Sequence, residues 1–193
     1  MNILGLSAFY HDSAAAFLID GQIKAASAEE RFSRKKHDNG FPLLASEFCL
    51  ASSGKTVYDI EAIAFYDKPL LKFERVLFTH FKYFPRSLKA FLAFMPKWVG
   101  QNLTVPIHIQ KNLDVDCPIY FVNHHESHAA SAFYCSPFDE AIVFVADGVG
   151  DWATTSWGIG KGTQLSLKQE IRFPHSLGLL YSTITAYLGF QPN

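Results

Sequence analysis

The chain has 193 residues, of which 49% are hydrophobic and 18% are charged, and its formal net charge at pH 7 is −1. This composition is typical of a folded globular protein, and the near balance of charge gives no indication of a nucleic-acid or membrane partner. The N-terminus has no basic region of the kind that opens a signal peptide, and no stretch reaches the length of an uncharged membrane span. A cytoplasmic location is therefore expected, and the three widely spaced cysteines are interpreted as reduced, buried thiols.

The first elements predicted along the chain are three short strands. Apolar runs at 2–8 and 13–19 predict the first two, and a third follows at 22–28. Asp20 and Gly21 separate the second strand from the third, and this dipeptide strongly favours a tight hairpin turn.

Helices and single strands then alternate. The spacing of apolar residues predicts helices at 42–54 and 125–134, strands at 60–67 and 118–122, and an aromatic helical segment at 69–99 that is broken before Pro85. Asn123 or His124 is expected to cap the helix at 125–134.

The pattern then restarts, with strands predicted at 140–147, 152–160 and 164–173 and a helix at 176–189 that has Ser176 as its N-cap. A β-β-β-α unit thus occurs twice, and each copy opens with a strand that runs into an aspartate-containing turn. This α/β pattern resembles the duplicated lobes of the actin/hexokinase/Hsp70-like (ASKHA, ribonuclease H-like) ATPases. We expect a first lobe at 1–138 and a second lobe at 139–193 that is cut short, in a chain that is a piece of a longer protein.

Three histidines, His124, His125 and His128, crowd into five residues, and Asp147 follows at the end of an apolar strand. His124 and His128 are four residues apart, which on a helix is a rotation of about 40°, so both face one side. His125 points elsewhere. Two imidazoles and a carboxylate suit Fe²⁺ or Zn²⁺. From spacing alone, an equally good interpretation is that the histidines cap a helix and Asp147 shapes a turn.

Five blocks in order carry a more specific resemblance: "HDSAAAFL", "EERFSRKKHD", "NHHESHAASAF", "DGVGDWATTSWGIG" and "HSLGLLYSTITAYLGF". Together they resemble the N-terminal part of the NodU/CmcH carbamoyltransferase family, whose N-terminal domain is similar to the tRNA threonylcarbamoyl-transfer ATPase domain. The resemblance implies transfer of a carbamoyl group from carbamoyl phosphate to a hydroxyl of a sugar-like or natural-product acceptor. It also implies that a YrdC-like C-terminal domain, absent from this chain, makes a carbamoyl-adenylate from carbamoyl phosphate and ATP.

The resemblance also assigns roles to particular residues. It places His124, His128 and Asp147 at the family's metal positions and favours iron over zinc. It places His11 near the carbamoyl group and the acceptor hydroxyl, where a neutral imidazole can act as general base, with Asp12 orienting it or binding the acceptor.

Two further groups are weaker candidates. Gly148, Val149 and Gly150 form a turn whose backbone N–H groups can approach phosphate or nucleotide oxygens. Arg31 and Lys36 belong to a basic cluster that can bind a phosphorylated substrate, although a solvated charged loop fits the same residues equally well.

Two alternative functions stay open. A sugar-kinase-like phosphotransferase on the same fold would need an aspartate base and Mg²⁺ but no pair of histidine ligands. A non-catalytic fragment would only bind metal or associate with a partner. Because Leu179, Leu180, Ile184, Tyr187 and Leu188 share an apolar stripe that needs a covering surface, the chain alone is also expected to self-associate.

Overall fold

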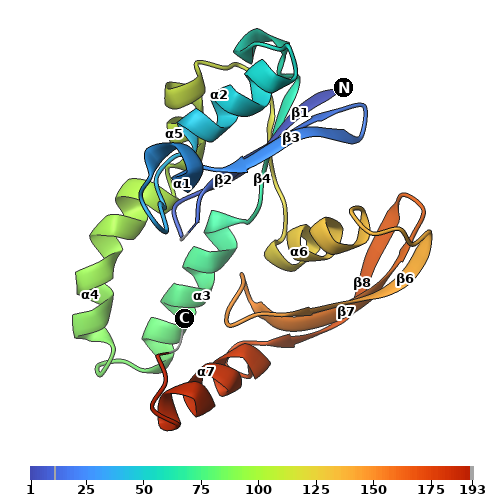
Figure 1. Ribbon diagram of the computed structural model, residues 1–193. Coiled ribbons are helices and arrows are strands. Elements are labelled where there is room, and N and C mark those ends of the chain that lie inside the picture. The colour runs from blue at the N-terminus through green and yellow to red at the C-terminus, as the bar shows by residue number, and fades with distance from the viewer. Residues whose placement is uncertain (11, 192–193) are drawn as a thin grey trace. The chain divides into compact units, whose positions relative to one another are not determined.

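The structure is a computed structural model, and it describes residues 1–10 and 12–191 apart from the side chains of residues 97, 101 and 102 (Figure 1). The chain packs as two compact units. The first comprises Met1–Pro69 and His80–Val122, and the second comprises Leu70–Thr79 and the chain from Asn123 onward. The lobe boundary after residue 138 stays a prediction, but residues 123–138 pack with the second unit.

The first unit contains a five-stranded mixed sheet in the order β3-β2-β1-β4-β5. Strand β1 is antiparallel to β2 and parallel to β4, and β4 is parallel to β5. The hairpin between β2 and β3 turns at Asp20 and Gly21, both of which have positive φ, as the sequence predicts. The strands are β1 (Asn2–Ser7), β2 (Ala14–Ile19), β3 (Gln22–Ala28), β4 (Ala62–Phe65) and β5 (Ile119–Phe121).

Helix α2 (Leu43–Ser52) covers this sheet and packs on β2 and β3. Leu4, Phe17 and Ile63 are fully buried in the resulting core. The buried carboxylate of Glu29 accepts hydrogen bonds from the backbone N–H groups of Leu44 and Ala45, so it caps the first turn of α2 from a distant position. The predicted α/β class and the β-β-β-α order are confirmed.

The predicted aromatic segment consists of two helices with Pro85 between them, so the predicted break is confirmed. The sequence analysis did not assign four of the helical elements. The remaining elements of this region are α1 (Glu30–Ser33), a 3₁₀ turn (Val57–Asp59), α3 (Pro69–Lys82), α4 (Leu88–Lys97), a π-helical turn (Trp98–Asn102) and α5 (Val105–Leu113).

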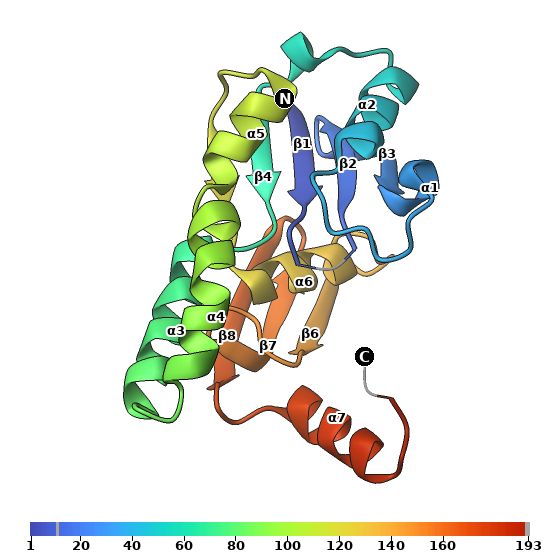
Figure 2. The same ribbon diagram turned by 90° about the vertical axis from the view of Figure 1, so that its left-hand side faces the viewer.

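The second unit is an antiparallel meander of β6 (Glu140–Ala146), β7 (Ala153–Lys161) and β8 (Gln164–Arg172), followed by α7 (Leu177–Tyr187). Helix α6 (His124–Phe133) lies across one face of this sheet (Figure 2). Its Phe133 ring packs directly over Gly160 of β7, where an added Cβ would lie 2.6 Å from the ring. The missing side chain therefore lets the helix approach the strand closely, and the core forms from Ala129, Phe133, Val143 and Val145.

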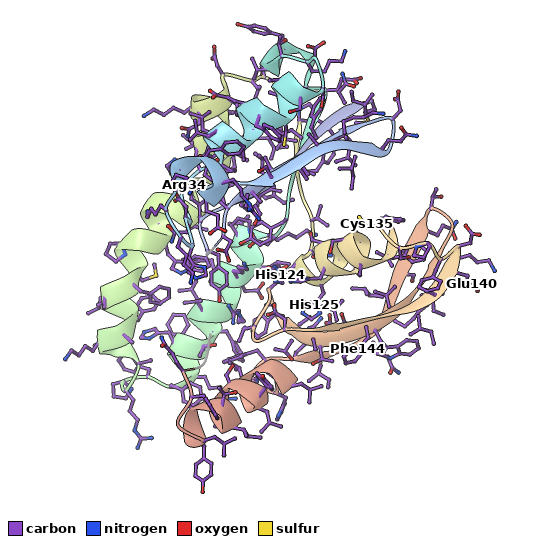
Figure 3. The ribbon with its side chains drawn as sticks, in the orientation of Figure 1. Arg34, His124, His125, Cys135, Glu140 and Phe144 are labelled. Atoms are coloured by element: carbon purple, nitrogen blue, oxygen red, sulfur yellow. The ribbon has the colours of Figure 1, made fainter. Side chains whose placement is uncertain are left out.

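The opposite face of this sheet is apolar and exposed. Ile142 pairs across the strands with Ile159, and Phe144 pairs with Trp157. All four side chains are exposed, and Phe144 lies on the side of the sheet away from α6 (Figure 3). The second unit thus has one covered face, which carries the polar side chains described below, and one uncovered apolar face.

In the part of the chain that the structure describes, no helix is both long and apolar enough to cross a membrane. The three cysteines are free, as expected. The prediction that all three are buried holds for Cys49, whereas Cys117 is only partly buried and Cys135, just after the end of α6, is exposed.

Candidate metal centre

The first two turns of α6 place two imidazoles side by side. The Nε2 atoms of His124 and His128 are 3.1 Å apart, and the two rings meet edge to face with centroids 4.7 Å apart. This is the geometry that residues four apart on one helix face produce. The prediction that both imidazoles face one side is therefore confirmed.

Asp147 brings a carboxylate to the same place from the end of β6. Its backbone N–H donates to the carbonyl of Thr154, which extends the β6–β7 pairing by one residue. Its Oδ2 lies 3.0 Å from His124 Nε2, and its Oδ1 accepts a hydrogen bond of 2.6 Å from the N–H of Gly148. Within the described residues, one ligand atom from each of His124, His128 and Asp147 lies within 4.8 Å of the other two.

The electrostatics of the cluster favour an ionised Asp147 and a neutral His128. The hydrogen bond from the His124 side chain lowers the pKa of Asp147 to about 2, so this carboxylate is ionised at neutral pH. His128 is partly surrounded by protein, although much of its surface is exposed, and this desolvation lowers its pKa. The lower pKa favours the neutral imidazole. Because metal ligands must be deprotonated, a divalent cation would displace the proton that His124 donates to Asp147. Two imidazoles and a carboxylate then suit an ion such as Fe²⁺ or Zn²⁺.

The loop after Asp147 also holds the start of α6. The Oδ2 of the buried Asp151 accepts a 3.0 Å hydrogen bond from the backbone N–H of His124. Asn123 occupies the N-cap position, which was one of the two predicted alternatives. Its side chain makes no capping hydrogen bond. A carboxylate is favourable at a helix N-terminus, so Asp151 supplies the cap that the local sequence does not.

Gly150 lets this loop approach the histidines. An added Cβ would lie 2.9 Å from the carbonyl oxygen of Ala153, 3.0 Å from His124 Cδ2 and 3.2 Å from His125 Cδ2. Gly148, in contrast, has open space where a Cβ would point. Of the two glycines, only Gly150 is required by close packing.

The start of α7 lies against the same loop. Ser176 accepts a 3.0 Å hydrogen bond from the N–H of Leu179, which confirms it as the predicted N-cap. Its hydroxyl lies 2.7 Å from the carbonyl oxygen of Gly148 and 3.1 Å from that of Asp147. Elements on both sides therefore fix the backbone that carries the Asp147 carboxylate.

His125 points away from the ligand cluster, as predicted. Its side chain lies between α6 and the sheet, and its Nδ1 is 2.7 Å from Ser156 Oγ on β7 (Figure 3). Burial lowers the pKa of this imidazole. The sequence analysis did not identify Ser156 or Asp151, because neither forms a motif with the histidines along the chain.

The other predicted site residues take varied positions. His11 lies outside the described residues. Asp12 is exposed in the first unit, and its Oδ1 lies 2.9 Å from Nδ1 of His37, a histidine that the sequence analysis did not single out. Arg31 and Lys36 are exposed.

The predicted phosphate-binding turn of Gly148, Val149 and Gly150 is part of the loop that follows Asp147. Two of its amides make hydrogen bonds within the loop and its strand: the Gly148 N–H donates to Asp147 Oδ1, and the Gly150 N–H donates to the carbonyl of Ala153.

The fold is that of an α/β protein with repeated β-β-β-α units, and comparison with known proteins gives the family. The model of the family described as "Carbamoyltransferase N-terminus" matches residues 2–193, so the chain belongs to this family. The Synechocystis protein sll1178 is 51% identical over 200 residues, covering 100% of this chain and 32% of that protein. The nodulation protein NolNO of Sinorhizobium fredii is 35% identical over 189 residues, covering 94% of this chain and 26% of that protein.

The chain thus spans about a third or less of the length of these two relatives. Among solved structures, YeaZ from Pseudomonas aeruginosa aligns with a TM-score of 0.45 and 15% sequence identity, over 88% of this chain and 67% of that one.

Proposed function

We propose that this chain is the N-terminal part of an O-carbamoyltransferase and that it binds a divalent metal through His124, His128 and Asp147. The observation that carries the proposal is the convergence of these three ligand atoms within 4.8 Å, in a chain that the carbamoyltransferase family model matches from residue 2 to 193. Membership of this family supports carbamoyl transfer as the general activity. Iron is favoured, and zinc fits the same donor set.

The proposed reaction uses carbamoyl phosphate and ATP, which a YrdC-like domain of the full-length protein converts to carbamoyl-adenylate. The acceptor is a hydroxyl of a sugar-like or natural-product molecule. Its oxygen forms a bond with the carbamoyl carbon, and the bond between that carbon and the phosphate oxygen of AMP breaks. The hydroxyl proton passes to the imidazole of His11, and Asp12 orients this imidazole or binds the acceptor.

When bound, the cation would supply positive charge to a negatively charged oxygen of the reacting group. The residues of this chain have the separate task of presenting their donor atoms in a fixed arrangement. Asp147 stays ionised because His124 donates to it, and the cap by Asp151 fixes the helix that carries both imidazoles. These three side chains therefore need to move less when the cation binds.

The test uses the full-length protein with ATP and carbamoyl phosphate. We expect pyrophosphate release and, with a panel of sugars and hydroxylated natural products, carbamoylation of one class of acceptor. His128→Ala should abolish acceptor carbamoylation and leave pyrophosphate release intact, whereas Glu126→Ala, an exposed position on the same helix, should change neither. Release of ADP with phosphorylation of the sugar would establish the kinase function instead, and the absence of both reactions would favour a metal-binding module.

A further inference from the structure

Of the three neighbouring histidines at the start of α6, His125 is the one that the proposed metal site does not use. Its side chain is 3% exposed, and its only hydrogen bond among the described residues joins Nδ1 to Ser156 Oγ at 2.7 Å. Its Nε2 is buried and has no hydrogen-bond partner in the described part of the chain. The ring centroid is 6.2 Å from that of His124 and 6.4 Å from that of His128. His125 therefore lies beside the ligand cluster without belonging to it.

Fold stability does not explain why a histidine occupies this position. An unsatisfied polar atom in the interior costs at least as much free energy as one net hydrogen bond contributes. An apolar side chain of similar size, such as leucine, would remove the buried Nε2 and still fill the space between α6 and β7. Core packing alone therefore gives no reason for an imidazole at this position.

The hydrogen bond to Ser156 ties the first turn of α6 to strand β7. Polar contacts that tie the first turn of α6 to the strands and loop beneath it include His124 N–H to Asp151, His124 Nε2 to Asp147, and His125 to Ser156. The contact with Asp147 belongs to the ligand cluster itself, whereas the bond between His125 and Ser156 lies outside it. Farther along the helix, Ala129 and Phe133 pack through apolar contacts, which have no preferred direction.

A small rotation of this helix would disrupt the ligand cluster. Side-chain ends lie about 5–6 Å from a helix axis, so turning α6 by about 20° would move the His124 ring by about 2 Å. That displacement is about ten times the tolerance of roughly 0.2 Å on a metal–ligand distance, and it would break the 3.0 Å contact between His124 and Asp147.

We propose that His125, through its hydrogen bond to Ser156, is a positioning residue that sets the rotation of α6 and so holds His124 and His128 opposite Asp147. The proposal rests on the metal site of the proposed function. It assigns the buried hydrogen bond to ligand placement and predicts that metal affinity and fold stability respond differently to its removal.

Substituting His125 by asparagine or by glutamine tests the roles of its two ring nitrogens separately. Asparagine at position 125 places a polar atom near the position of Nδ1 and can keep the bond to Ser156, whereas glutamine places its polar atoms near the position of Nε2. Leucine keeps neither. Ser156→Ala removes the bond from the other side, and Ser46→Ala is its matched control, because Ser46 is an equally buried, hydrogen-bonded serine of the first unit.

The experiment titrates the whole metal-free chain with Co²⁺, follows the visible absorption of the bound ion, and measures the melting temperature of each metal-free variant. We expect His125→Gln, His125→Leu and Ser156→Ala each to weaken Co²⁺ binding by about tenfold, the lower end of the range for residues that orient ligands. His125→Asn and Ser46→Ala should bind as the wild type does. The melting temperature of His125→Leu should equal or exceed that of the wild type.

The outcomes separate the two proposals. If the wild type binds Co²⁺ and His125→Leu binds it equally well, the positioning role is overturned and the metal site stands. If all substitutions at position 125 lose affinity and melting temperature together, His125 has a structural role and the positioning proposal is also overturned. If the wild type binds no Co²⁺, both the metal site and the positioning role fail. Combining His125→Leu with Ser156→Ala should add no further loss, because both remove one interaction.

Discussion

Replacing Asp147 by asparagine should remove a specific part of the acid sensitivity of the fold. The hydrogen bond from His124 lowers the pKa of this carboxyl from 3.8 to about 2, and its side chain is 29% exposed. A carboxyl whose pKa is lower in the folded than in the unfolded state stabilises the fold above the unfolded pKa, and this contribution is lost as the pH falls through the folded pKa. A difference of this size corresponds to about 2 kcal/mol.

The assay is urea unfolding of the metal-free chain in the presence of a chelator, at several values between pH 6 and pH 2. The wild type should lose about 2 kcal/mol of unfolding free energy between about pH 4 and pH 2 that the Asp147→Asn variant does not lose. Asp139→Asn removes an exposed carboxylate nearby in the sequence and should follow the wild type.

Identical pH dependence for the wild type and Asp147→Asn would refute the pairing of this carboxylate with His124. The ligand cluster would then lose its main electrostatic support, because the ionised state of Asp147 is what prepares it for a cation. A larger loss in the variant than in the wild type would mean that the pKa of Asp147 is raised by burial, the opposite of the shift described above.

Four other substitutions or measurements test separate parts of the molecule. His128→Ala should remove bound metal with little change in the circular dichroism spectrum, as checked by elemental analysis. Gly150→Ala should weaken metal binding by displacing its loop from the histidines, whereas Gly148→Ala, at an open position, should not; calorimetric titration with Zn²⁺ compares them. In the full-length protein, His11→Ala should abolish acceptor carbamoylation and spare pyrophosphate release from ATP. Sedimentation of the chain alone should show self-association that Leu180→Ser reduces, because the apolar side chains of α7 are exposed.

Much of the fold follows from local sequence patterns. The strands of both sheets are apolar runs bounded by turns, and the hairpin at Asp20 and Gly21 depends on two residues that accept positive φ. Helix α5 was not assigned, although Val105, Ile109 and Leu113 recur every four residues and are all buried in the structure. This periodicity is visible in the sequence, but helix α5 has only nine residues and comes soon after a π-helical turn. The pattern is therefore too short to separate the helix from the segment before it.

The candidate site was predictable in part, for a physical reason. His124 and His128 share a face because helix geometry alone puts residues four apart together, and no tertiary information is needed. Asp151 and Ser156 depend on tertiary packing instead: Asp151 reaches the start of α6 from a loop 27 residues later, and Ser156 faces the helix because of its register opposite Val145. Local pattern thus indicates candidate ligands, and only the fold identifies the residues that hold them in place.

The loop from Asp147 to Asp151 links the metal and phosphate predictions to each other. Its glycines were predicted to approach phosphate, but the amides of Gly148 and Gly150 already make hydrogen bonds within the loop and its strand. An ionised Asp147 at the head of the loop also repels an anion. A cation held by that carboxylate and the two imidazoles would reverse the sign of the local field, because a bound divalent ion is the largest charge in its surroundings. If both predictions hold, phosphate should bind at this loop only after the cation, because the metal-free loop presents a carboxylate and amides that already make hydrogen bonds.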